Sequence, residues 1–156
     1  MFRPDAAVRV GLTQAQTEVL MKSLQKMFAA HPQANTHTDS LAEAVAHIDM
    51  CGQVCTSCAD ACLAEPSVDE LTYCIRLNLD CADVCVATSR MLARQTKPDP
   101  SLTRELLAVC ATACRVCAEE CERHAVMHEH CRICAEHCRR CVEVCERAMV
   151  NTAIIV

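Results

Sequence analysis

Apolar residues along this chain recur at intervals of three and four, the spacing that places side chains on one face of an α-helix. The first such segment spans residues 13–30, and His31 and Pro32 predict its end. A polar stretch up to residue 38 then separates it from the rest of the chain. The pattern predicts a short amphipathic helix whose apolar side carries Val19, Leu20, Leu24, Met27 and Phe28.

Four longer helical segments follow, and they are predicted at residues 41–64, 68–95, 102–125 and 128–149. Asp39 or Ser40 is a suitable N-cap for the first of them. The connections are short and are marked by Pro66, by Pro98 with Pro100, and by the stretch HAVMHEH. Short connections make consecutive helices antiparallel.

The predicted fold is therefore all-α, an antiparallel four-helix bundle with an extra N-terminal helix. Its expected parts are the N-terminal helix and linker at 1–38, the bundle at 39–149 and an apolar tail at 150–156. The tail either extends the last helix or packs on another subunit.

Cysteine occupies the seam positions of all four long segments. The steps between cysteines are mostly four, three and four residues, which keeps them on one stripe of a helix, where a bundle normally carries leucine. The second segment has Asn78 where this spacing expects a cysteine. The stripes contain the candidate metal ligands Cys51, Cys55, Cys58, Cys62, Cys74, Cys81, Cys85, Cys110, Cys114, Cys117, Cys121, Cys131, Cys134, Cys138, Cys141 and Cys145.

Composition narrows the role of these cysteines. The chain has 156 residues, 16 of them cysteine, with no Trp, one Tyr and two Phe, so sulfur must fill much of the core. Its net charge of −5 argues against nucleic-acid binding, and no apolar run is long enough to span a membrane. The first thirty residues lack the pattern of an export signal, which predicts a cytosolic protein with reduced thiols.

One or two buried cysteines could simply act as small hydrophobic residues. Sixteen cysteines at matching seam positions of four helices favour a chemical role instead. Disulfides are disfavoured because i,i+4 side chains leave separate turns of a helix in parallel and do not easily approach closely enough. Metal binding is the interpretation that spacing and compartment favour.

Thiolates select soft metals, namely Cu(I), zinc or the iron of iron–sulfur clusters. Residues at i,i+4 have Cβ atoms about 5–6 Å apart, and two metal–sulfur bonds of about 2.3 Å can bridge them. Four zinc ions in sixteen thiolates would leave about eight uncompensated charges, whereas about one Cu⁺ per thiolate leaves the core nearly neutral. Iron–sulfur proteins often carry CxxCxxCxxxCP, which is absent. We therefore predict several Cu(I) ions per chain.

Histidine and methionine gather at both predicted ends of the bundle. His124 and His128 continue the step from Cys121, and with Met127 and His130 they are expected at the end where the third helix meets the fourth. We predict that His124 and His128 take up copper there. Four further residues are expected at the opposite end, with packing as their simpler role: His47, Met50, Met91 and Met149.

The motifs CGQVCTSCADAC, CATACRVCAEEC and CRICAEHCRRCVEVC resemble the bacterial cytosolic copper storage proteins. The resemblance covers about residues 39–149. It implies a non-enzymatic protein that stores and buffers Cu(I) inside a four-helix bundle, assembles as a homotetramer and exchanges copper with a chaperone as donor or acceptor. Two alternatives stay open: a zinc or mixed soft-metal sequestering protein, and a thiol redox protein, which would need one exposed reactive pair.

Overall fold

The computed structural model describes residues 14–34 and 37–151, and the side chains from residue 22 onward within those ranges. Every regular element in this part of the chain is helical. The elements are α1 (Gln14–Ala29), α2 (Thr38–Leu63), the short 3₁₀ helix η1 (Val68–Leu71), α3 (Thr72–Leu92), α4 (Pro100–His124) and α5 (Glu129–Val150). The predicted all-α fold is confirmed, while the start of the first helix at Thr13 and the tail beyond Asn151 lie outside the described residues.

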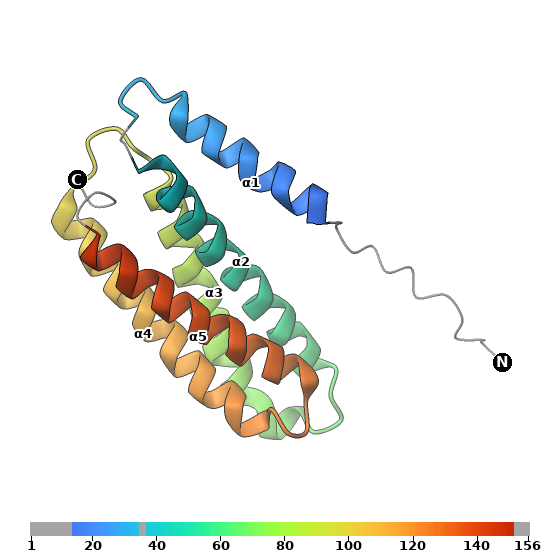
Figure 1. Ribbon diagram of the computed structural model, residues 1–156. Helices are drawn as coiled ribbons and strands as arrows, with labels where there is room; N and C mark the ends of the chain where they lie inside the picture. Colours follow the sequence, from blue (N-terminus) through green and yellow to red (C-terminus); the bar gives the residue numbers. More distant parts are fainter. Residues whose placement is uncertain (1–13, 35–36, 152–156) are drawn as a thin grey trace.

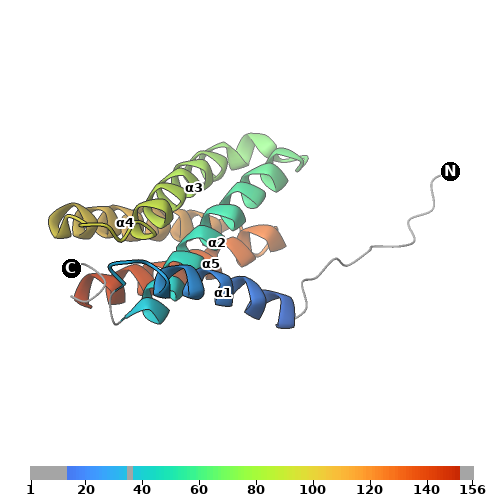
Figure 2. The same ribbon diagram turned by 90° about the horizontal axis from the view of Figure 1, so that it is seen from above.

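Helices α2 to α5 form the bundle, with each helix packed against the next and α5 against α2 (Figure 1). The α2–α3 and α4–α5 connections lie at one end of the bundle, and the α3–α4 connection lies at the other (Figure 1). Seen from above, the α2–α3 pair runs obliquely to the α4–α5 pair (Figure 2). The antiparallel order expected from short connections is therefore the observed one.

Helix α1 lies outside the bundle and packs along α2 (Figures 1 and 2). Phe28 is buried against the bundle, and Leu24 is partly buried beside it. Met27, expected on the same apolar side, is 69% exposed. Among the described side chains of α1, the predicted apolar side thus contacts the bundle through Leu24 and Phe28, while the side chains of Val19 and Leu20 lie outside the described part of the structure.

The helix ends differ from expectation by a few residues. Helix α2 begins at Thr38, and Asp39 lies inside its first turn. A negative charge at this position interacts favourably with the helix dipole. The second predicted segment is divided into η1 and α3, and it ends at Leu92. Helix α4 begins two residues early, because Pro100 suits the first helical position and the Asp99 side chain accepts a hydrogen bond from the Leu102 N–H at 2.8 Å.

Small residues let the helices approach closely. A Cβ atom at Gly52 would lie 3.2 Å from Cγ2 of Val86 and 3.3 Å from the carbonyl oxygen of Ala82. Gly52 therefore allows α2 and α3 to pack at a separation that a larger residue would increase. In the described part of the chain, no helix is long and apolar enough to cross a membrane.

Candidate metal site

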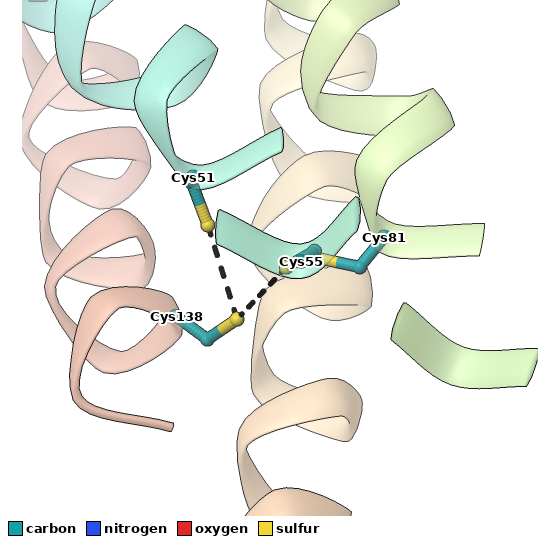
Figure 3. Close-up of side chains that lie close together, drawn as sticks. All are labelled: Cys51, Cys55, Cys81 and Cys138. Carbon is teal, nitrogen blue, oxygen red and sulfur yellow. Dashed lines mark hydrogen bonds between the residues drawn. The ribbon is translucent and has the colours of Figure 1, made fainter. Parts of the chain in front are cut away.

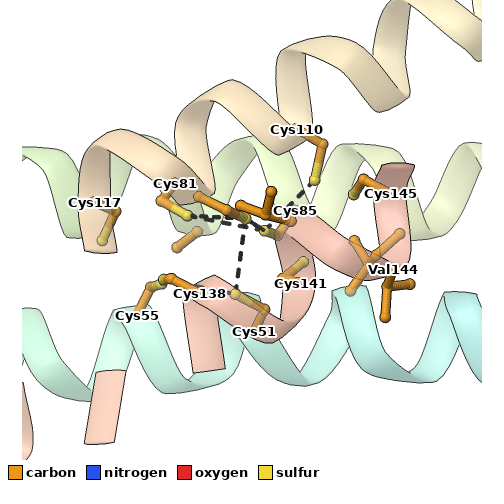
Figure 4. Packing of buried hydrophobic residues seen from close by; sticks show 14 of the residues in the cluster. Cys51, Cys55, Cys81, Cys85, Cys110, Cys117, Cys138, Cys141, Val144 and Cys145 are labelled. Carbon is orange, nitrogen blue, oxygen red and sulfur yellow. Dashed lines mark hydrogen bonds between the residues drawn. The ribbon is translucent and has the colours of Figure 1, made fainter. Parts of the chain in front are cut away.

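All sixteen cysteines point into the bundle, and each exposes at most 2% of its surface. They line the space between α2, α3, α4 and α5, and Figure 4 shows a part of this lining from close by. The sulfur atoms take the place of the large aliphatic side chains that fill an ordinary bundle. The sequence-predicted cysteines are therefore brought together as one continuous column.

The thiols are free, and their sulfur atoms are spaced for metal binding. Cys138 Sγ lies 3.5 Å from Cys55 Sγ and 3.8 Å from Cys51 Sγ (Figure 3). Within one helix, the sulfur atoms of Cys81 and Cys85 are 4.0 Å apart. A disulfide requires about 2 Å, whereas two sulfurs bound to one metal with bonds of about 2.3 Å lie about 3.8 Å apart at a tetrahedral angle and about 4.6 Å apart in a line. A metal could thus be held both within a helix, as predicted, and between helices.

The column contains overlapping sets of ligands whose donor atoms all lie within 4.8 Å of one another. One set is Cys51, Cys55, Cys81 and Cys138, the residues drawn in Figure 3. Cys51 recurs in a set with Cys85, Cys114 and Cys141, and Cys55 and Cys138 recur in a set with Cys117 and Cys134. Because the sets share members, one thiolate can bridge metals in neighbouring sets.

Asn78, which interrupts the row of cysteines on α3, is completely buried among thiols. Its amide nitrogen donates to the carbonyl oxygen of Cys74 at 2.8 Å and lies 3.4 Å from the Cys121 sulfur. Its Oδ1 atom accepts from the thiols of Cys134 at 3.0 Å and Cys117 at 3.5 Å. The sequence left the role of this position open; in the structure Asn78 joins three helices and presents an oxygen to the thiol column.

Burial disfavours the charged form of the metal-free thiols. Burial raises the pKa of Cys62, and hydrogen bonds with the Cys110 and Cys141 thiols, together with burial, raise the pKa of Cys145. The buried polar or charged side chains in the described chain are Asn78, Thr88, Ser89 and Glu120, so no lysine or arginine offsets charge in the core. A bound cation must therefore balance the thiolates that it creates.

Three histidines lie at the end of the bundle formed by the α2–α3 and α4–α5 connections; we call this end the histidine mouth. His124 ends α4, His128 precedes α5, and His130 lies in the first turn of α5. Nδ1 of His130 lies 3.4 Å from the Cys131 sulfur and 3.6 Å from the Cys58 sulfur. The predicted uptake residues, His124 and His128, are at this mouth.

His130 was placed at this end by the sequence but not among the metal ligands. It forms a set with Cys58, Cys62 and Cys131 whose donor atoms lie within 4.8 Å of one another. The spacing of His130 did not mark it as a ligand, because it lies two residues after His128, and residues at i and i+2 of a helix do not share a face. Only the packing of α5 against α2 turns its ring toward the sulfurs.

The opposite end of the bundle is closed by aliphatic side chains. Ile48, Leu92 and Leu107 are buried there. His47 is half-buried, and burial together with the nearby charge of Arg140 lowers its pKa. Met50 is largely exposed on the outer surface of α2. This aliphatic plug lies between the end of the bundle and the thiol column. Met149 packs against the buried core, which suits the expected packing role, whereas the exposure of Met50 does not.

Comparison with known proteins connects this thiol column to copper. The chain is similar to the Streptomyces lividans copper storage protein Ccsp, whose structure was determined with 10 copper equivalents: 45% identity, a TM-score of 0.78, and coverage of 81% of this chain and 98% of that one. A second structure from S. lividans, a cytosolic copper storage protein with five coppers, gives 50% identity, a TM-score of 0.71, and coverage of 72% and 94%.

A curated relative, the uncharacterized cysteine-rich protein YhjQ of Bacillus subtilis, is 39% identical over 64 residues, which are 41% of this chain. The matched part spans 56% of the length of that relative. The sequence profile of the copper storage protein family matches residues 37–150, which include α2 to α5 and every cysteine. This chain therefore belongs to the copper storage protein family.

Proposed function

We propose that this chain stores and buffers many Cu(I) ions through the thiolates of its bundle core. The observation that carries the proposal is the column of sixteen free, buried thiols arranged in overlapping ligand sets. Thiolate is the ligand that Cu(I) prefers. Each Cu⁺ that replaces a thiol proton leaves the charge of the core unchanged, so the column can fill without a growing penalty for buried charge.

Zinc remains the alternative metal, and the shared ligands argue against it. A structural zinc ion takes four thiolates that it does not usually share, and it leaves a charge of about −2 on the site. Cys51, Cys55 and Cys138 each belong to two sets, so closed zinc sites could not occupy all the sets together. Low-coordinate Cu(I) with bridging thiolates uses the same sulfurs more completely.

Storage also explains the arrangement better than catalysis or thiol redox chemistry does. A redox enzyme needs one accessible, activated pair of thiols, whereas these sixteen are similarly buried. We infer a non-enzymatic role in the cytosol, supported by the similarity to a protein described as cytosolic. A copper chaperone would be the donor or acceptor of the metal.

We also propose a homotetramer, as the family resemblance implies. Leu102, Val109 and Val116 are exposed at intervals of seven residues along the outer face of α4. Such a stripe suits packing against another helix. Light scattering coupled to gel filtration should give the mass of four chains, and a smaller assembly is expected for the Val109→Lys/Val116→Lys variant.

The identity of the metal is tested by competition. The reduced, metal-free protein is titrated with Cu(I) in the presence of a Cu(I) chelator, and separately with Zn(II) in the presence of a zinc chelator. We expect the protein to take Cu(I) from the chelator until many ions are bound and to retain little zinc. Preference for Zn(II), with saturation at about four ions per chain, would favour the zinc alternative.

A further inference from the structure

A single carboxylate oxygen joins two histidines at the histidine mouth. Oε1 of Glu65 lies 3.1 Å from Nδ1 of His128 and 3.1 Å from Nε2 of His130. The two imidazole rings are 5.4 Å apart and inclined by 33°. Glu65 comes from the connection after α2, whereas both histidines come from the start of α5. The contact therefore links two segments that are distant in sequence.

This contact determines which nitrogen of each neutral imidazole carries the proton. A carboxylate only accepts hydrogen bonds, and a neutral imidazole has one N–H and one lone pair. His130 must therefore carry its hydrogen on Nε2, and His128 must carry its hydrogen on Nδ1. Hydrogen bonds from His130 and His128 lower the pKa of Glu65, which keeps the carboxylate ionised as an acceptor. The two neighbouring histidines thus hold opposite tautomers.

The tautomer of His130 leaves the correct atom free for copper. Its bare Nδ1 is the atom that faces the sulfurs of Cys131, Cys58 and Cys62, at 3.4, 3.6 and 3.9 Å. Cu(I) binds a lone pair, so the other tautomer would present an N–H to the same three sulfurs. The bare nitrogen of His128 is Nε2, on the side of the ring away from Glu65.

We propose that Glu65 is a positioning residue for copper uptake, which fixes the tautomers and orientations of His128 and His130 at the mouth of the thiol column. The inference rests on the proposed storage function. Carboxylates that accept the second N–H of a metal-binding histidine commonly change metal affinity or activity about 10–100-fold when removed. Glu65 would act in this way on two histidines at once.

A similar arrangement is found at the third histidine of the mouth. Nε2 of His124 lies 3.1 Å from Oε1 of Glu120, whose side chain is mostly buried. The other carboxylate oxygen of Glu120 accepts a hydrogen bond from Arg123 at 3.0 Å, which fixes its orientation. All three mouth histidines therefore direct one N–H to a carboxylate and leave the other nitrogen bare. Glu65 differs because one oxygen serves two rings.

The test compares Glu65→Ala and Glu65→Gln with the Glu70→Ala control. Glu70 is exposed in η1, at the same end of the bundle, so its removal changes the charge by the same amount. The first measurement is ¹⁵N NMR of the imidazole nitrogens in the reduced, metal-free protein, which reports the tautomer without copper. The second is stopped-flow uptake of Cu(I).

We expect wild type and Glu70→Ala to show His130 with its hydrogen on Nε2 and His128 with its hydrogen on Nδ1. Glu65→Ala should show mixed tautomers and slow the earliest uptake phase about tenfold. Glu65→Gln keeps an acceptor oxygen and should be intermediate. Unchanged imidazole spectra in Glu65→Ala would overturn this inference alone, as would equal slowing in Glu70→Ala, which would indicate simple charge attraction. A wild-type chain that binds no Cu(I) would overturn the storage function as well.

Discussion

The Oδ1 atom of Asn78 accepts a hydrogen bond from the Cys134 thiol at 3.0 Å and thereby connects α3 to α5 inside the thiol column. The same side chain donates to the Cys74 carbonyl oxygen at 2.8 Å. Asn78 thus does not simply fill the missing position of the cysteine row. Its amide nitrogen and oxygen both find hydrogen-bond partners inside the core, as buried polar groups require.

Replacing Asn78 by alanine should destabilise the metal-free protein. Asn78→Ala removes buried hydrogen bonds and leaves a small cavity, so we expect the free energy of unfolding to fall by about 2 kcal/mol. Urea unfolding of the reduced protein measures the change. The control is Thr112→Ala, whose hydroxyl bonds to its own helix at an exposed position and should change stability by less than about 0.5 kcal/mol. Equal stability of Asn78→Ala and wild type would contradict this role.

The reduced protein without metal should already be folded and helical. Protonated thiols behave as small hydrophobic groups, and the column is continued by buried Ile48, Leu71 and Leu107. Copper would then enter a preformed bundle rather than induce folding. Circular dichroism in the presence of reductant and chelator should show a helical spectrum that changes little on copper addition. A random-coil spectrum that becomes helical only with copper would show that the metal drives folding.

Copper capacity should approach the number of thiols. If each thiolate bridges two ions and each ion takes about two thiolates, the chain should bind about 16 Cu(I), with a few more at the histidine mouth. Metal analysis after gel filtration of the saturated protein measures this number. In the Cys81→Ser/Cys85→Ser variant, capacity should fall by about two ions. Unchanged capacity in that variant would show that the thiols of Cys81 and Cys85 do not hold copper.

The mouth histidines should affect the rate of uptake more than the capacity. The imidazoles of His124 and His128 are partly exposed and can accept Cu(I) at neutral pH, whereas a buried thiol must first lose a proton. His124→Ala/His128→Ala should therefore slow the earliest phase of stopped-flow loading while leaving the final copper content nearly unchanged.

The matched control for this variant is His31→Ala/His37→Ala. His31 precedes α2 and contacts Thr96 in the α3–α4 connection, at the opposite end from the mouth. We expect this control to load at the wild-type rate. If the mouth variant loads as fast as wild type, uptake occurs elsewhere, and the end with His47 and Met149 becomes the candidate despite its aliphatic plug.

The sequence alone determined the helices, the faces that they bury and the chemistry of the core. The alternating steps of three and four from Cys51 to Cys62 place those residues on one side of α2, because 3.6 residues complete one turn. Short connections then made an antiparallel bundle the expected arrangement. The ends of the helices were predicted less accurately. Pro100 was expected in the connection before the third long helix, yet it begins α4, because proline suits the first turn of a helix.

Only the tertiary structure decided which sulfurs meet and which polar atoms face them. Periodicity places Cys55 and Cys138 on buried faces, but their 3.5 Å contact depends on the axial offset and crossing of α2 and α5. The same offset turns His130 toward Cys58 and brings Glu65 to it from another connection. Such contacts join residues more than sixty positions apart, and a pattern that repeats along one helix contains no information about its alignment with the next.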